Sequence, residues 1–96
     1  MSNERLMTLK PEVRRVLSRE KMVCDVAIAR LRERFRSLEQ RYGWTTQEFV
    51  EKFNSGEAGD DQELFHWYAL AEAAKDWQKT RDSLEELLRG SELVNA

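Results

Sequence analysis

Apolar side chains recur every three or four residues over two long stretches of the chain. In the first stretch, from Cys24 to Tyr42, the steps between successive apolar positions are 4, 3, 4, 3 and 4 residues, which is the spacing of one face of an α-helix. Pro11 suits the first helical turn, where its missing N–H costs nothing, and Gly43 suits the helix end. The pattern predicts a helix over residues 11–42, roughly 48 Å long at 1.5 Å per residue.

The second stretch repeats this alternation of three- and four-residue steps as far as Leu88. Asp60 and Glu63 are expected to supply the caps at its start, where the helix dipole also favours acidic side chains. Gly90 is expected to end it, so the pattern predicts a helix over residues 61–89. The apolar seam of this helix is expected to contain Trp67, Leu70, Ala74, Trp77, Arg81, Leu84 and Leu88.

The connection between the two stretches carries its own helix signals. Thr45 and Glu48 have the spacing of a capping box, in which each side chain bonds to the backbone N–H of the other residue. Trp44 and Phe49 stand at the two positions of a hydrophobic staple. These signals predict a short helix over residues 46–55.

Two long helices joined by a short connection predict an all-α fold, an antiparallel helical hairpin with a short connecting helix. The hairpin makes a single domain over residues 1–96, with a frayed tail at 91–96. Its length of roughly 48 Å far exceeds the ~12.5 Å radius of gyration of a compact chain of this size. Two helices cannot enclose a core, so another helical layer is required, and a second copy would give a dimeric four-helix bundle.

Aromatic side chains concentrate around the connection, since seven of the nine lie between residues 42 and 68. Helical spacing and the staple favour a small aromatic core at the closed end of the hairpin; the alternative is a docking surface. The expected cluster is Tyr42, Trp44, Phe49, Phe53, Phe65, Trp67 and Tyr68.

Residues 22–29, MVCDVAIA, are apolar on almost every side of the first long helix. Cys24 and Ile28 belong to the seam that meets the second long helix, whereas other apolar side chains point elsewhere. Contiguous exposed apolar surface marks an interface, and arginines beside it suit carboxylates of an acidic partner. The predicted interface, with a second copy or with a target, is Met22, Val23, Val26, Arg30 and Arg34.

The net charge is −2, but basic and acidic side chains are distributed unequally along the chain. Residues 1–42 carry eleven basic and six acidic side chains, a net charge of +5, and residues 43–96 carry five and twelve, a net charge of −7. The two halves therefore attract each other, or the opposite half of a second copy. Nucleic-acid binding is not expected, because no helix-turn-helix or basic β-ribbon is visible.

The residue pattern does not favour a catalytic site or a metal site. The only histidine, His66, follows Glu63 at the Glu-x-x-His spacing that forms half of a di-metal carboxylate site, with Glu39 as a further ligand. Glu63, however, is expected to cap a helix. No Gly-rich phosphate loop or nucleophile elbow is present, so we predict no catalytic residue, no metal and no cofactor.

The apolar runs are shorter than the roughly 20 residues of a membrane span, and the N-terminus lacks an apolar signal core. The lone Cys24 is expected to be buried in a reducing compartment. A cytoplasmic protein without membrane association is predicted.

Residues 41–70 resemble a pattern in small archaeal and cyanobacterial proteins thought to be antitoxins of toxin–antitoxin pairs. The matching residues are Tyr42, Gly43, Thr46, Glu48, Phe49, Gly56, Asp60, Asp61, Phe65 and Trp67. The resemblance implies a non-catalytic protein that binds and neutralises a toxin encoded beside it. The alternatives are a structural or adaptor dimer that binds another protein, and a dimeric di-metal carboxylate protein.

Overall fold

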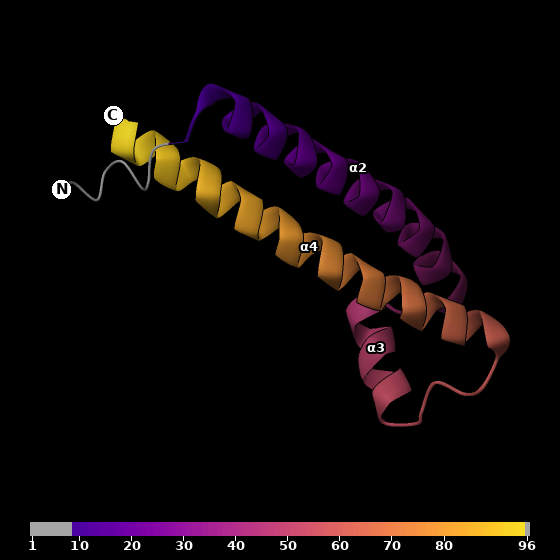
Figure 1. Cartoon of the computed structure of the whole chain (residues 1–96). Coiled ribbons are helices and arrows are strands. Elements are labelled where there is room, and N and C mark those ends of the chain that lie inside the picture. Colours follow the sequence, from indigo (N-terminus) through magenta and orange to yellow (C-terminus); the bar gives the residue numbers. More distant parts are fainter. Residues whose placement is uncertain (1–8, 96) are drawn as a thin grey trace.

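Three helices form the chain in the computed structural model, which describes residues 9–95 and the side chains of residues 9–90. They are α2 (Pro11–Tyr42), α3 (Thr46–Asn54) and α4 (Gln62–Asn95). Figure 1 shows α2 and α4 side by side and antiparallel, with α3 at the closed end of the hairpin. The all-α antiparallel hairpin with a short connecting helix is thus confirmed. The molecule measures 59 × 23 × 18 Å, and its radius of gyration of 18.5 Å is that of an elongated body.

The predicted end of the first long helix and the predicted start of the short helix are confirmed. Gly43 ends α2 with a left-handed backbone, φ 74°, and its N–H donates to the carbonyl of Glu39 at 2.8 Å. At the start of α3, the Glu48 N–H donates to Thr45 Oγ1 at 3.0 Å. In return the Thr45 N–H donates to the Glu48 carboxylate at 2.9 Å, which completes the capping box. The staple is formed as well, since the rings of Trp44 and Phe49 stack with centroids 6.4 Å apart.

α4 begins within one residue of its predicted start, but its cap residue and its other end differ from the prediction. Asp61 rather than Asp60 precedes the helix, and its carboxylate lies 3.4 Å from the Glu63 N–H, a long hydrogen bond. The Glu63 side chain takes no part in the cap and turns towards α2. At the other end α4 continues beyond Gly90, through the expected frayed tail, to Asn95. Gly90 has no positive φ, and one glycine inside a helix costs only about 1 kcal/mol.

The core lies between α2 and α4 and is largest at the closed end, where α3 covers it. Two rings form its centre: Phe49 and Trp67 are fully buried and stack with centroids 4.0 Å apart at an interplanar angle of 3°. Trp67 also ties α4 to α3, because its indole N–H donates to Thr46 Oγ1 at 3.2 Å. The buried apolar side chains are Cys24, Ile28, Phe35, Leu38, Phe49, Leu64, Trp67 and Ala71.

The predicted seam is confirmed on α2 and largely on α4, where Trp67 is buried and the half-buried positions include Leu70, Ala74, Arg81, Leu84 and Leu88. Trp77, assigned to the seam, is 37% exposed, whereas Leu64 and Ala71, which were not assigned to it, are buried. Arg81, which was also assigned to the seam, is half-buried and forms an ion pair with Asp25 of α2. At the closed end α4 thus buries a broader face than predicted, because Leu64 and Ala71 pack in one cluster with Phe49 of α3.

Candidate functional site

Glu63 joins the two long helices at the closed end. Its carboxylate accepts hydrogen bonds from Arg41 Nη1 at 2.8 and 2.6 Å and from the Tyr42 hydroxyl at 2.7 Å. The hydrogen bond from Tyr42, and then that from Arg41, lower the pKa of Glu63 below its ordinary value. The same bond to Glu63 raises the pKa of Tyr42. All three groups thus hold each other in a structural cluster.

The residues considered for a di-metal site do not meet. Arg34 Nη2 donates to His66 Nε2 at 2.9 Å, since a guanidinium has no acceptor. The Glu39 carboxylate accepts from the Thr46 N–H at 2.7 Å, and Glu63 is bound by Arg41. Within residues 9–90, no three His, Cys, Asp or Glu side chains lie close enough to hold a metal ion.

A second polar cluster fixes the register of the helices near the middle of the hairpin. Arg81 Nε donates to Asp25 at 2.7 Å, and its Nη1 donates to Glu85, one turn further along α4, also at 2.7 Å. The hydrogen bond to Asp25 is the main cause of the raised pKa of Arg81. Asp25, the one charged residue within residues 22–29, is thus paired with Arg81 of the other long helix.

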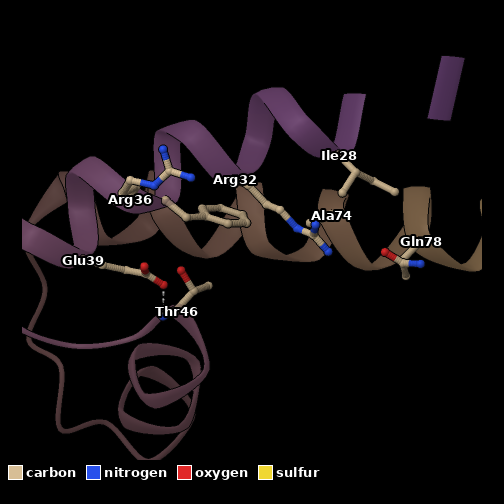
Figure 2. A pocket seen from close by; sticks show the side chains of 8 residues that line it. Ile28, Arg32, Arg36, Glu39, Thr46, Ala74 and Gln78 are labelled. Carbon is tan, nitrogen blue, oxygen red and sulfur yellow. Dashed lines mark hydrogen bonds between the residues drawn. The ribbon is translucent and has the colours of Figure 1, made fainter. Parts of the chain in front are cut away.

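A shallow pocket of about 380 Å³ lies between α2 and α4 beside the start of α3. Figure 2 shows Arg32 extending from α2 towards α4 near Ala74, and Glu39 beside Thr46. Arg36 lines the same pocket. Two guanidinium groups next to an apolar wall suit an acidic side chain, while Glu39 is already committed to the Thr46 backbone. This pocket could not be predicted from the sequence, because its walls come from three helices.

The apolar residues assigned to the predicted interface are exposed. Met22 is 66% exposed, and Val23 and Val26 are each 46% exposed. Arg30 and Arg34 are exposed on the same helix, and only Arg34 is held, by His66. What these five residues bind stays a prediction. Three further exposed apolar side chains, Val16 of α2 and Trp77 and Leu87 of α4, were not assigned to the predicted interface.

The aromatic cluster forms the expected small core. Its seven rings make a continuous series of contacts at the closed end. Phe65 is the most open of them, at 53% exposure, and it packs edge-on against Phe53. Helix packing accounts for the buried rings, while a docking role for the exposed Phe65 stays a prediction.

No protein-family model, curated protein or solved structure matches this chain. The resemblance to antitoxins therefore stays a prediction carried by the residues quoted above. Across residues 9–95, none of the helices combines the length and the apolar character that crossing a membrane requires.

Proposed function

We propose that this chain is a non-catalytic binding protein that acts as an antitoxin, neutralising a protein toxin by direct contact. The observation that carries the proposal is the apolar patch of Met22 and Val26 on the outer side of α2. Contiguous apolar surface on a small protein marks an interaction site. We call these two residues the outer patch.

The outer patch and its surroundings contain methionine and arginine, two residue types that are enriched at protein–protein interfaces. Helical spacing puts Met22 and Val26 on one side of α2, away from Cys24, which faces α4. Arg19 lies one turn before Met22 and is exposed. An apolar centre with an arginine at its edge fits an acidic partner surface, because arginine pairs with carboxylates in two-bond geometry.

The polar groups elsewhere in the hairpin support binding over catalysis. Glu63, His66 and Asp25 are each bonded to an arginine of the other long helix, so their contacts hold the helices together. A structural or adaptor protein would use the same outer patch on a different target. The identity of the product encoded beside this chain separates the two functions.

The test is co-expression of this chain with the product of the adjacent gene. We expect the chain to relieve that product's inhibition of growth and to copurify with it at a fixed stoichiometry. Met22→Glu with Val26→Glu should abolish both effects, since it buries unpaired charge at the contact. Gln40→Glu, an exposed position on α2 outside the patch, is the matched control and should leave both effects intact. Growth inhibition without relief and without copurification would refute the antitoxin function; copurification without inhibition would favour the adaptor.

A further inference from the structure

The two broad sides of the hairpin differ. One side is covered at the closed end by α3, which contacts α4 through Trp67 and Thr46. The other side is marked by the bond between Arg34 of α2 and His66 of α4. Helical spacing places further side chains on the side marked by that bond. We call this side the open face; it consists of Val16, Val23, Arg30, Arg34, His66, Ala73, Trp77, Leu84 and Leu87.

The open face carries half of the large exposed apolar side chains in the described part of the chain. Val16 is 56% exposed, Val23 46%, Trp77 37% and Leu87 55%. Val16 and Val23 lie seven residues apart on α2, and Trp77 and Leu87 lie ten residues apart on α4, so each pair falls on one side of its helix. Two antiparallel helices with such apolar pairs on a shared side present half of a four-helix bundle.

We propose that a second copy of this chain packs on the open face, with the two closed ends together. The two-fold axis then runs parallel to the hairpin, and α2 of each copy lies across from α4 of the other. The inference goes beyond the proposed function, because it assigns a different surface from the outer patch and holds whatever the partner of that patch is.

Charge selects the second copy and its orientation. Nine basic and five acidic residues lie in α2, whereas α4 has four basic and seven acidic residues. A two-fold axis in the interface can be parallel to the helices or perpendicular to them. The perpendicular axis would place basic α2 against basic α2, and the parallel axis places it against acidic α4. Because basic α2 and acidic α4 attract each other, electrostatic complementarity favours the parallel axis.

The register of the hairpin gives one specific pair across this interface. Arg41 bonds to Glu63 and Asp25 to Arg81, so Arg30 lies level with residues 74–76. With the closed ends together, Arg30 of one copy comes beside Asp76 of the other, at the edge of the open face. Arg30 and Asp76 are exposed, and neither makes a hydrogen bond or an ion pair with another described residue.

The open face is also large enough for a stable dimer. A standard interface buries about 800 Å² on each partner, and this face extends along a molecule 59 Å long. On the opposite side α3 projects from the closed end, which prevents two hairpins from packing flat against one another (Figure 1).

Sedimentation velocity at micromolar concentration tests the proposal, with circular dichroism to verify that each variant is helical. The wild type should be a dimer. Val23→Asp should produce monomers, whereas Val26→Asp, a valine of equal exposure three residues away, should remain dimeric. A monomeric wild type, or equal effects of the two substitutions, would overturn the open face as the interface.

Charge reversal tests the orientation independently. Arg30→Asp and Asp76→Arg should each weaken the dimer about tenfold or more, because each places like charges in contact twice per dimer. The combination R30D with D76R should restore wild-type association. Failure of the double substitution to restore it would overturn the arrangement with closed ends together. Neither result depends on toxin neutralisation, which the outer-patch variants measure separately.

Discussion

Glu63 joins the two long helices through its ionised carboxylate. Its folded pKa is lowered by Tyr42 and Arg41, so its stabilising contribution is present above the pKa of the unfolded chain. The contribution is lost as the pH falls through the lowered folded pKa. We therefore expect Glu63→Gln to reduce the free energy of unfolding at pH 7 and to have little effect near pH 2, as measured by urea denaturation.

The matched control for this substitution is Glu86→Gln, which removes the same charge from an exposed position of α4. It should leave the free energy of unfolding nearly unchanged at both pH values, because Glu86 has no partner among the described residues. An equal loss at pH 7 and pH 2 for Glu63→Gln would show that its packing, not its charge, stabilises the closed end.

At the scale of elements, α3 depends on its first turn. A helix of nine residues is only marginally stable on its own. The capping box of Thr45 and Glu48 satisfies two backbone N–H groups that would otherwise lack partners. We expect Thr45→Ala to destabilise the chain by about 1 kcal/mol and to speed hydrogen exchange chiefly within α3. Ser83→Ala on the exposed side of α4 is the control and should change neither quantity; exchange that speeds up uniformly along the chain would contradict a local role for the cap.

The helices themselves could be predicted because their limits are set by local chemistry. Pro11 and Gly43 delimit α2, and Thr45 with Glu48 begins α3, since each acts on its own backbone within one turn. Gly90 shows the limit of this reasoning. A glycine ends a helix only where the chain also leaves the helical conformation, and here the backbone continues to Asn95.

The burial of Leu64 and Ala71, and the partners of the site residues, depend on contacts with other helices. Leu64 and Ala71 pack in one cluster with Phe49 of α3, which periodicity within α4 does not reveal. The ion pairs of Asp25 with Arg81 and of Arg41 with Glu63 likewise depend on how α2 and α4 are aligned. The exposure of Met22, Val23 and Val26 could be predicted, because a helix with apolar residues on all sides must leave some uncovered.

At the scale of the whole molecule, the hairpin separates two surfaces on one helix. Val23 lies on the open face with α4, and Met22 and Val26 lie on the outer side of α2. A second copy on the open face would leave the outer patch accessible, and two such patches would stand on opposite sides of the four-helix bundle. Self-association and target binding are therefore compatible in one particle.

The arrangement of the two copies can be measured with spin labels and pulsed electron paramagnetic resonance. Cys24 is buried and is replaced by Ala, so that labels attach only to an introduced cysteine, Glu57→Cys at the closed end or Arg15→Cys near the open end. With closed ends together, each homogeneous sample should give distances well below the 59 Å length of the molecule. In mixed dimers, in which one copy carries the label at residue 57 and the other at residue 15, the distance between the labels should approach that length. The perpendicular axis predicts the reverse pattern, short distances only in the mixed dimers, because it brings the closed end of one copy beside the open end of the other.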